Sequence, residues 1–483
     1  MTYGAFIGGN RVEGRGERFA STDPATGETV WQANAASPEQ VREAFKAARA
    51  AFRGWSRTPL AERRKVVEAY RDVVTRRKDE IAELIARETG KPLWEAATEA
   101  ASMAAKAGVS IAAQDERAGR KVTDTEFGQA VLDHRPLGVM FVLGPYNFPG
   151  HLPNGHIIPA LLAGDTVVFK PSELTPATGA LMAECWAEAG LPDGVLNVVQ
   201  GARETGAAAL DDPDLDGVLF TGSWATGSFI HRKFAGRPGI QMALEMGGNT
   251  PLVVWDAKDS DAAARVAVLS AYISAGQRCS CARRLIVPEG AAGDAVVAAV
   301  ADMAARLPIG AWNADPEPFM GPLVSSKAAY GVLAAQDQLL ELGGKPLLKA
   351  ARLDKGEAFV SPGLIDVTGV KTPDEEVFGP LLQVRRVASF EDALAAANDT
   401  AYGLAAGLVS DSEDRWADFV SEIRAGIVNW NRPTTGAAST MPFGGPGQSG
   451  NLRPSAYYAA DYAAYPVATQ AAPTLEKMPV KGI

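Results

Sequence analysis

From residue 137 onward, short and almost uninterrupted apolar runs alternate with amphipathic stretches, and this pattern constrains the fold more than any other feature of the chain. Such runs are typical of parallel strands that helices cover on both faces. A first series lies at residues 139–143, 166–169, 195–199, 218–220 and 241–244, with helix-like segments near 154–163, 177–189 and 226–234 between the runs. The alternation predicts a doubly wound α/β domain.

A second series of apolar runs follows Gly247 and Gly248, at residues 252–255, 285–287, 381–387, 407–409 and 426–428. No Pro- or Ser-rich linker separates the two series, and a chain of 483 residues is long enough for two large domains. We therefore expect two closely packed α/β halves with a cleft between them.

The two ends of the chain show different patterns. We expect the first hundred residues to be mostly helical, because Ser37 and Gln40 form a capping box before a helically spaced apolar face. A second long helix is expected after Pro59 and should end near Gly90. The segment 464–469 is either an edge strand or part of a surface tail.

The composition is that of an ordinary globular enzyme. Hydrophobic residues make up 47% and charged residues 22% of the chain, which excludes a disordered protein. The formal net charge of −10 leaves no excess of Lys and Arg to neutralise phosphates, so neither nucleic acid nor an anionic membrane is an expected partner. No apolar run approaches the ~20 residues that span a bilayer. The lack of a signal-peptide pattern and the three cysteines favour a cytoplasmic location.

The segment from Gly276 to Cys281 carries the sharpest chemical signal. A cysteine after a glycine turn can lie exposed at the start of a segment, where backbone N–H groups stabilise a thiolate. Cys279 is therefore a candidate nucleophile, with a buried core cysteine or a Cys-x-Cys metal pair as alternative interpretations. The chain has one further cysteine, Cys185, and four histidines without paired ligand spacing, so no metal is expected.

Two polar residues follow predicted strands and complete a candidate catalytic set. Glu245 ends the fifth apolar run and precedes two glycines, where a carboxylate can act as a base, although a purely structural hydrogen-bonding role is the alternative. Asn147 follows the first run, and its side-chain N–H can donate to a developing oxyanion or simply cap a turn.

Two further loops at strand ends are suited to a nucleotide. The segment from Phe220 to Gly227 has a strand, a glycine turn and a helix start, which present free N–H groups to phosphate. Lys170 and Glu173 follow another strand and can hold hydroxyl groups of a ribose. Together with a thiol, a base and an amide donor, these loops indicate covalent catalysis on a carbonyl coupled to hydride transfer.

Taken in order, these motifs resemble those of the NAD(P)-dependent aldehyde dehydrogenase family over nearly the whole chain. The matching segments are 145–149, 170–173, 220–223, 245–248, 276–279, 376–380, 442–445 and 449–450. The resemblance implies a Rossmann-type cofactor domain, an α/β catalytic domain and a small oligomerisation region, hence a homodimer or higher homo-oligomer. It places the cofactor domain at 1–122 and 142–245, the catalytic domain at 246–440, and the oligomerisation and tail region at 123–141 and 441–483.

The resemblance also implies roles for individual residues. Cys279 would be the nucleophile and Glu245 the general base, while Asn147 and the Cys279 backbone N–H would form the oxyanion hole. NAD would contact Lys170, Ser172, Glu173, Gly222, Ser223, Trp224, Ala225, Thr226, Gly227, Glu376 and Phe378. The Glu173 carboxylate should repel the 2′-phosphate of NADP, which predicts a preference for NAD.

Three segments, 149–156, 222–227 and 278–284, narrow the resemblance to the branch of the family that oxidises a succinylated glutamate semialdehyde in arginine degradation. An aldehyde with several carboxylates needs cationic partners, for which Arg278 and Arg432 are the first candidates, followed by His151 and His156. The alternatives are another aliphatic semialdehyde, a coenzyme A–acylating aldehyde dehydrogenase, or a non-catalytic protein on the same scaffold. Glu245 favours hydrolysis over transfer to coenzyme A, because that transfer has less need of a carboxylate that activates water.

Overall fold

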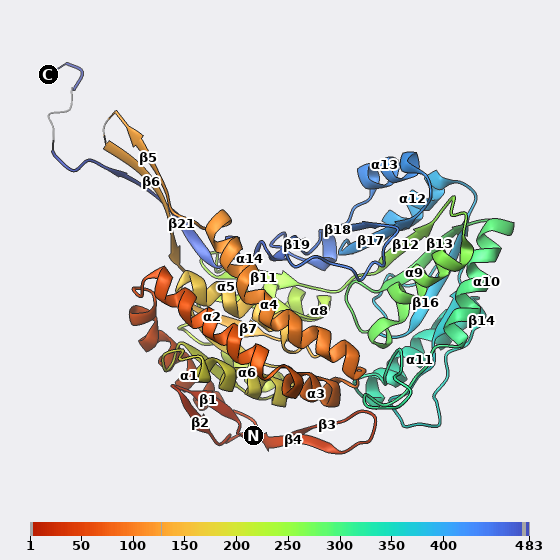
Figure 1. Ribbon diagram of the computed structural model, residues 1–483, viewed down its shortest axis with the longest axis horizontal. Helices are drawn as coiled ribbons and strands as arrows, with labels where there is room; N and C mark the ends of the chain where they lie inside the picture. The colour runs from red at the N-terminus through yellow and green to blue at the C-terminus, as the bar shows by residue number, and fades with distance from the viewer. Residues whose placement is uncertain (1–2, 127, 476–479, 483) are drawn as a thin grey trace.

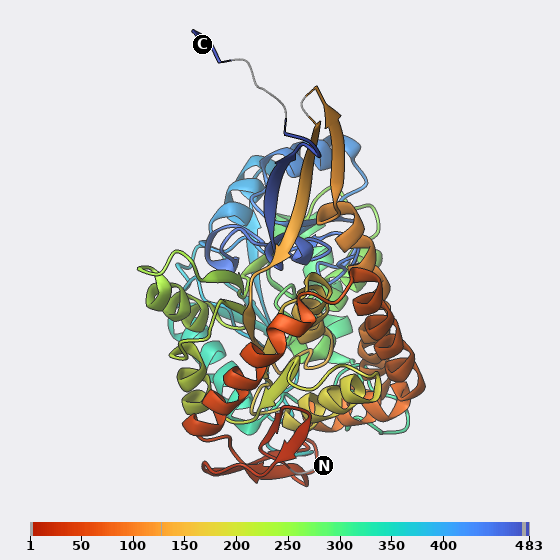
Figure 2. The same cartoon turned by 90° about the vertical axis from the view of Figure 1, so that its left-hand side faces the viewer.

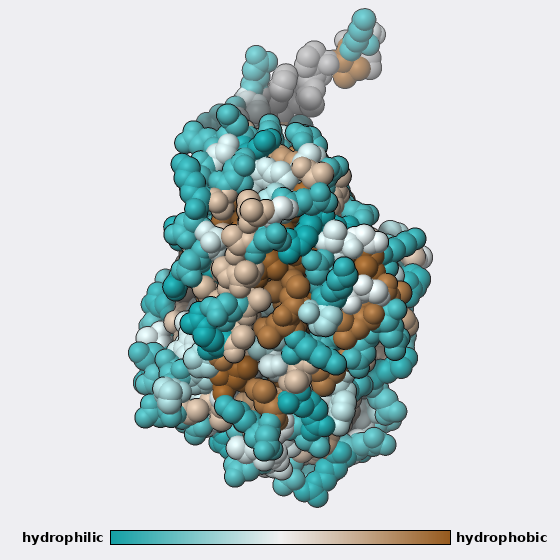
Figure 3. Space-filling model, turned by 90° about the vertical axis from the view of Figure 1, so that its right-hand side faces the viewer, coloured by the Kyte–Doolittle hydropathy of each residue, from teal (hydrophilic) through white to brown (hydrophobic). Residues whose placement is uncertain are grey.

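A computed structural model of the chain describes residues 3–126, 128–475 and 480–482. Within these residues the chain forms two seven-stranded sheets flanked by helices, and a three-stranded arm that projects from the body (Figure 1). The arm stands at the end of the molecule opposite to the N-terminal strands (Figure 2). On the face at the right of Figure 1, hydrophobic side chains form a central band within a largely hydrophilic surface (Figure 3).

The first sheet confirms the predicted doubly wound domain. Its strand order is β11-β10-β7-β8-β9-β1-β2, in which the five strands from β11 to β9 are parallel. The parallel part of the sheet therefore begins at its central strand β7 and winds outward in both directions, which places a crevice at the carboxyl ends of the strands. The strands are β7 (Val139–Leu143), β8 (Thr166–Lys170), β9 (Leu196–Val199), β10 (Gly217–Thr221), β11 (Gln241–Glu245), β1 (Ala5–Ile7) and β2 (Asn10–Val12), and the helices are α5 (His151–Ala163), α6 (Pro176–Glu188), α7 (Arg203–Leu210) and α8 (Trp224–Phe234).

The second sheet, in the order β14-β15-β16-β13-β12-β17-β18, forms the other half of the body and is parallel except for β14. All five predicted strands are present, and β14 and β15 are additional. β14 is too exposed and β15 too short to give a sequence signal of their own. The elements are β12 (Thr250–Val254), β13 (Ala282–Pro288), β14 (Lys345–Leu348), β15 (Gly363–Asp366), β16 (Leu381–Val387), β17 (Ala405–Val409), β18 (Ile427–Trp430), α9 (Ser260–Tyr272), α10 (Ala291–Ala305), α11 (Ser326–Glu341), α12 (Phe390–Asn398) and α13 (Glu413–Glu422).

The N-terminal region packs helices against the first sheet. The capping box at Ser37 is present, with Gln40 at the third helical position. The single helix expected after Pro59 is two helices, because the chain breaks at Arg77, and Gly90 ends the second of them in a left-handed conformation. Four short strands in the first 34 residues were not foreseen. The elements are α1 (Pro38–Trp55), α2 (Leu60–Arg76), α3 (Lys78–Thr89), α4 (Leu93–Arg117), β3 (Arg18–Thr22) and β4 (Thr29–Asn34).

The arm joins a hairpin to the C-terminal segment. β6 (Gly128–Pro136) pairs with β5 (Lys121–Thr125) on one side and with β21 (Ala464–Ala471) on the other, both antiparallel. The segment 464–469 is thus an edge strand, not a loose surface tail. Residue 142, where the resemblance places a domain boundary, lies inside β7 of the first sheet.

Two short strands and a short α-helix lie between β18 and β21 in the chain. They are β19 (Pro442–Phe443), β20 (Ser455–Ala456) and α14 (Ala459–Tyr462). In the part of the chain that the structure describes, no helix combines the length and the hydropathy that a bilayer crossing requires.

Candidate active site

The carboxyl ends of the first sheet gather three of the predicted polar residues and one predicted loop along one edge. In the strand register, Leu143 lies beside Lys170, and Thr221 lies beside Glu245. Asn147 lies in the turn that follows β7 and is buried. This edge of the sheet therefore brings together Asn147, Lys170, the start of the loop after β10, and Glu245, as the strand-end pattern predicted.

Cys279 reaches the same region from the second half of the molecule, in the loop between α9 and β13. Three successive residues of this loop, Ser274, Ala275 and Gly276, have φ values of 56°, 52° and 72°. A Cβ at Gly276 would lie 2.1 Å from the Gly379 oxygen, so glycine allows the loop to pack directly on the segment before β16. The turn leaves Cys279 half-buried, while Cys185 and Cys281 are fully buried.

Two polar contacts hold this loop in place. Glu95 of α4 is completely buried and accepts hydrogen bonds from the Arg278 guanidinium at 2.8 Å and from the Ser274 hydroxyl. From the first sheet, the Asn147 side-chain N–H donates to the Gln277 carbonyl at 3.0 Å. The nucleophile loop is therefore fixed from both sides before any ligand binds.

Cys279 faces a cavity of about 220 Å³ between the two halves. Its lining combines the nucleophile with cationic, aromatic and small polar residues from α4, α5 and the segment before β19. Among them are Lys106, Phe148, His151, Arg278, Ser439 and Phe443. An aldehyde that enters this cavity can reach the thiol, which makes it the candidate substrate site.

Glu245 lies next to this cavity in a fully buried position, and its Oε1 atom has no hydrogen-bond partner among the described residues. Burial raises the pKa of the Glu245 carboxyl to about 8, against the opposing effects of the Lys106 ammonium and of a hydrogen bond from Thr221. The raised value agrees with the expectation that partial burial tunes this group toward neutrality.

The Cys279 thiol does not have the lowered pKa that a cysteine stabilised by backbone N–H groups would show. Burial raises its pKa well above the usual range, and the charges of Glu376 and Glu245 raise it further. The thiol is therefore protonated at neutral pH and needs a base.

The predicted nucleotide contacts that belong to the first sheet follow β8 and β10, the two strands that flank β7. Lys170 donates through Nζ to the Pro171 and Gly201 carbonyls, at 2.8 Å each, and its ammonium lies 3.7 Å from the Glu173 carboxylate. Ser172 is buried beside them. After β10, Ser223 caps α8 by accepting from the Thr226 backbone N–H at 3.3 Å.

The N-terminus of α8 is open to a ligand. Ser223, Trp224, Ala225 and Thr226 are all exposed, while Gly222 is half-buried and Gly227 is buried. A Cβ at Gly227 would lie 2.4 Å from the Met246 sulfur, so this glycine lets α8 pack against the segment after β11. The exposed first turn offers its N–H groups to a phosphate.

Glu376 and Phe378 lie in the segment before β16, against the nucleophile loop. One Glu376 oxygen lies 1.7 Å from where a Cβ at Gly247 would be, so a larger residue at position 247 would displace this carboxylate. Burial raises the pKa of Glu376 to about 7, and its Oε1 has no hydrogen-bond partner among the described residues. The Phe378 ring meets Tyr146 edge-on at 6.0 Å. An unsatisfied buried acceptor and an aromatic ring fit a bound ribose and nicotinamide.

The predicted substrate cations are placed differently from each other. Arg278 lines the cavity, but its guanidinium is already paired with Glu95. Arg432 is exposed and is not among the residues that line the cavity. Sequence reasoning missed Glu95 and Lys106, both from α4. A lone lysine in the alanine-rich stretch 100–107 was the available signal for Lys106, and Glu95 had none.

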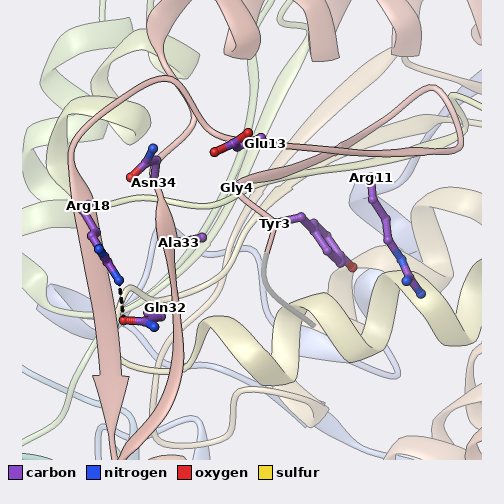
Figure 4. A pocket seen from close by; sticks show the side chains of 8 residues that line it. All are labelled: Tyr3, Gly4, Arg11, Glu13, Arg18, Gln32, Ala33 and Asn34. Atoms are coloured by element: carbon purple, nitrogen blue, oxygen red, sulfur yellow. Dashed lines mark hydrogen bonds between the residues drawn. The ribbon is translucent and has the colours of Figure 1, made fainter.

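A larger hollow of about 750 Å³ lies elsewhere, at the N-terminal strands (Figure 4). It is lined by Tyr3, Gly4, Arg11, Glu13, Arg18, Gln32, Ala33 and Asn34, and Arg18 donates to Gln32 at 2.9 Å. No nucleophile is among these residues, so the cavity at Cys279 is the one with reactive chemistry. Across the described ranges, no group of three or more His, Cys, Asp or Glu residues could hold a metal ion.

Comparison with known proteins defines the class to which this site belongs. The aldehyde dehydrogenase family model matches residues 11–465. The chain therefore belongs to the aldehyde dehydrogenase family and is an oxidoreductase that acts on aldehydes.

Individual relatives cover nearly the whole chain. It is 58% identical to N-succinylglutamate 5-semialdehyde dehydrogenase 2 of Caulobacter vibrioides, over 97% of this chain and 96% of that protein. It is 56% identical to N-succinylglutamate 5-semialdehyde dehydrogenase of Paraburkholderia xenovorans, over 96% of both chains. Among solved structures, an aldehyde dehydrogenase of Mycobacterium tuberculosis complexed with NAD+ has a TM-score of 0.89 at 32% identity, over 97% of this chain and 98% of that one.

Proposed function

We propose that the chain oxidises N-succinyl-L-glutamate 5-semialdehyde to N-succinyl-L-glutamate with NAD, a step of arginine degradation by the succinyltransferase route. The observation that carries the chemistry is Cys279, half-buried at a cavity between two sheets and subject to the charges of Glu245 and Glu376. The full-length similarity to relatives of that name supports the substrate.

Attack on the aldehyde begins with removal of the Cys279 proton, because burial keeps the thiol protonated. Glu245 is the carboxylate whose pKa of about 8 suits it to accept this proton through a water molecule. The sulfur then bonds to the aldehyde carbon and gives a thiohemiacetal. Asn147 uses one side-chain hydrogen on the Gln277 carbonyl, which leaves the second hydrogen for the oxyanion.

The cofactor residues act by holding and orienting NAD. Lys170, Ser172 and Glu173 would bind its adenosine ribose, the first turn of α8 its pyrophosphate, and Glu376 and Phe378 its nicotinamide end. Bound NAD would supply the hydride acceptor that the thiohemiacetal on Cys279 needs to become a thioester. Glu173 is half-exposed beside Lys170, in keeping with the predicted preference for NAD over NADP.

Hydrolysis of the thioester completes the reaction. Glu245 removes a proton from a water molecule, whose oxygen attacks the thioester carbon, and the Cys279 sulfur leaves and regains a proton. The buried position of Glu245 protects this base from bulk solvent. The same residue favours release of a free acid over transfer of the acyl group to coenzyme A.

A panel of aldehydes with NAD tests the proposed substrate. We expect kcat/KM for succinylated glutamate semialdehyde to exceed that for unsubstituted glutamate semialdehyde and for succinate semialdehyde. A higher value for either simpler aldehyde would reject the proposed substrate, and an acyl-coenzyme A product in place of the free acid would reject the hydrolytic mechanism.

We further propose that the enzyme works in the cytoplasm as a homodimer or higher homo-oligomer, with the arm as a subunit contact. β5 and β21 are both edge strands of the arm, and most of their side chains are exposed. An exposed edge offers unpaired backbone groups to another chain. Analytical ultracentrifugation of the full chain and of a chain that ends at residue 463 tests this contact, and an unchanged mass would reject it.

A further inference from the structure

Lys106 of α4 is a buried cation without a carboxylate of its own. It lines the cavity beside Cys279 and is only 2% exposed. Its ammonium forms no ion pair with any residue in the described part of the chain. The neighbouring cations differ in this respect, because Lys91 pairs with Glu99 at 2.9 Å and Arg278 pairs with Glu95 at 2.8 Å.

The packing of α4 on α5 directs Lys106 toward the cavity. A Cβ at Gly155 of α5 would lie 3.8 Å from the Lys106 Cε atom, so a longer side chain at residue 155 would compete for the space of the lysine stem. Gly155 lines the same cavity. The lysine therefore occupies room that α5 leaves free, and its charged end lies with the residues around the nucleophile.

The titratable groups around Lys106 do not neutralise it. His151 of α5 is half-buried and His156 is buried, and desolvation together with the Lys106 charge lowers their pKa values to about 4 and about 3, so both are neutral at physiological pH. Glu245 attracts the ammonium but is itself largely protonated near neutrality. Glu99, which also lines the cavity, is already paired with Lys91. A buried charge without a partner is costly, so a ligand that carries a carboxylate would bind here favourably.

We propose that Lys106 binds a carboxylate of the substrate and selects acidic aldehydes over neutral ones. The identity of the acidic aldehyde rests on the proposed function, but the role of the lysine does not depend on it. In this proposal Lys106 has the carboxylate-binding role that the sequence analysis assigned to Arg278 and Arg432.

Alkylation of Cys279 tests this role without any substrate. Iodoacetate carries a carboxylate and iodoacetamide does not, while both transfer a two-carbon group to the sulfur with loss of iodide. We expect Lys106→Met to lower the iodoacetate-to-iodoacetamide rate ratio at Cys279 by about 10-fold or more, as the loss of a charged hydrogen bond implies. Lys106→Arg, which keeps the charge, should retain most of the ratio. Peptide mass spectrometry separates Cys279 from Cys185 and Cys281.

Steady-state kinetics gives a second readout. We expect Lys106→Met and Lys106→Gln to raise KM for succinate semialdehyde and its succinylated counterpart by about 10- to 100-fold, with KM for butanal nearly unchanged. Lys106→Gln keeps a polar group in the buried position and serves as the variant that is easier to fold. An unchanged alkylation ratio in both variants would overturn the proposal, as would an equal loss with all aldehydes, which would mean that Lys106 acts only through Glu245.

The two proposals can fail separately. If the wild-type enzyme prefers succinate semialdehyde and loses this preference in Lys106→Met, the substrate assignment falls and the role of Lys106 stands. If the wild-type enzyme prefers the succinylated aldehyde and Lys106→Met keeps that preference over butanal, the role of Lys106 falls and the proposed function stands.

Discussion

The two sheets approach the active site with opposite ends of their strands. The first sheet contributes Asn147, Lys170 and Glu245 at or just after the carboxyl ends of β7, β8 and β11. The second sheet contributes Cys279 and the segment with Glu376 from loops that precede β13 and β16, at the amino ends of those strands. Two sheets with the same strand number and mostly parallel order thus have different roles at one site.

This difference shows how each side is held rigid. Residues at strand ends inherit their position from the hydrogen-bonded ladder, so Glu245 needs no special backbone. The Cys279 loop lacks a ladder and relies on left-handed residues, on Glu95, and on Arg283, whose guanidinium donates to the Arg278 and Gly379 carbonyls at 3.0 and 3.2 Å. The base lies on a fixed edge, whereas the nucleophile lies on a loop that buried charges hold in place.

Removal of the Cys279 thiol should have the largest effect, and it should affect the chemistry of the second-sheet side without affecting NAD binding on the first. Cys279→Ala should lower aldehyde oxidation by about 10⁴-fold or more, because the covalent intermediate forms on the sulfur that this variant lacks. The first sheet should be unaffected, so NAD binding measured by calorimetry should stay close to that of the wild type. Residual activity within tenfold of the wild type would contradict the assignment.

Removal of the base should affect hydrolysis more than acylation. Glu245→Gln should slow turnover by about 10²- to 10⁴-fold, since the water that attacks the thioester loses its proton acceptor. Intact-protein mass spectrometry should then detect an acyl adduct on Cys279. Normal turnover without an adduct would mean that the base lies elsewhere.

Asn147 connects the two sides, because it follows β7 and donates to the loop that carries Cys279. Asn147→Ala should lower kcat by about 10²- to 10³-fold, the usual effect of losing one oxyanion donor. Stopped-flow measurement of the first turnover should place this loss in acylation, not in hydrolysis. If the variant is slow only in hydrolysis, the assignment of Asn147 to the acylation step is wrong.

The pH dependence of thioester hydrolysis should report the titration of Glu245, on the first-sheet side of the site. The base form of Glu245 decreases about tenfold for each pH unit below its pKa of about 8, so the rate of thioester hydrolysis should rise with pH and level off above 8. Single-turnover measurements between pH 6 and 9 would reveal this step. The step should vanish in Glu245→Gln, and its persistence there would point to another titrating group.

Much of the first side was predictable because strand ends are visible in a sequence. The apolar runs placed β7, β8, β10 and β11 within one or two residues, and the residues that follow them are the candidate site. The edge strand near residue 464 was visible for the same reason, although its pairing with β6 was not. Short polar strands such as β3 and β14 carry too few buried residues to produce a pattern.

The second side was harder to predict, because its geometry depends on contacts between distant residues. The segment around Cys279 indicated a candidate nucleophile, but not that burial would raise the pKa of the thiol. Glu95 lies 184 residues before Cys279, and nothing near it in the chain announces a buried carboxylate that holds the Arg278 guanidinium. Arg278 was predicted to face the substrate from its position alone, whereas its ion pair depends on how α4 crosses the loop.

Helix α4 carries Glu95, Glu99 and Lys106 at intervals of four and seven residues, hence along one stripe of its surface. Glu95 anchors the loop of the nucleophile, and Lys106 lines the chamber that the aldehyde enters. A tilt of α4 would shift Glu95 and Lys106 together and would misalign the Cys279 sulfur. A change of substrate during evolution is therefore expected to come from substitution of residue 106, because a shift of α4 would also displace the loop that carries Cys279.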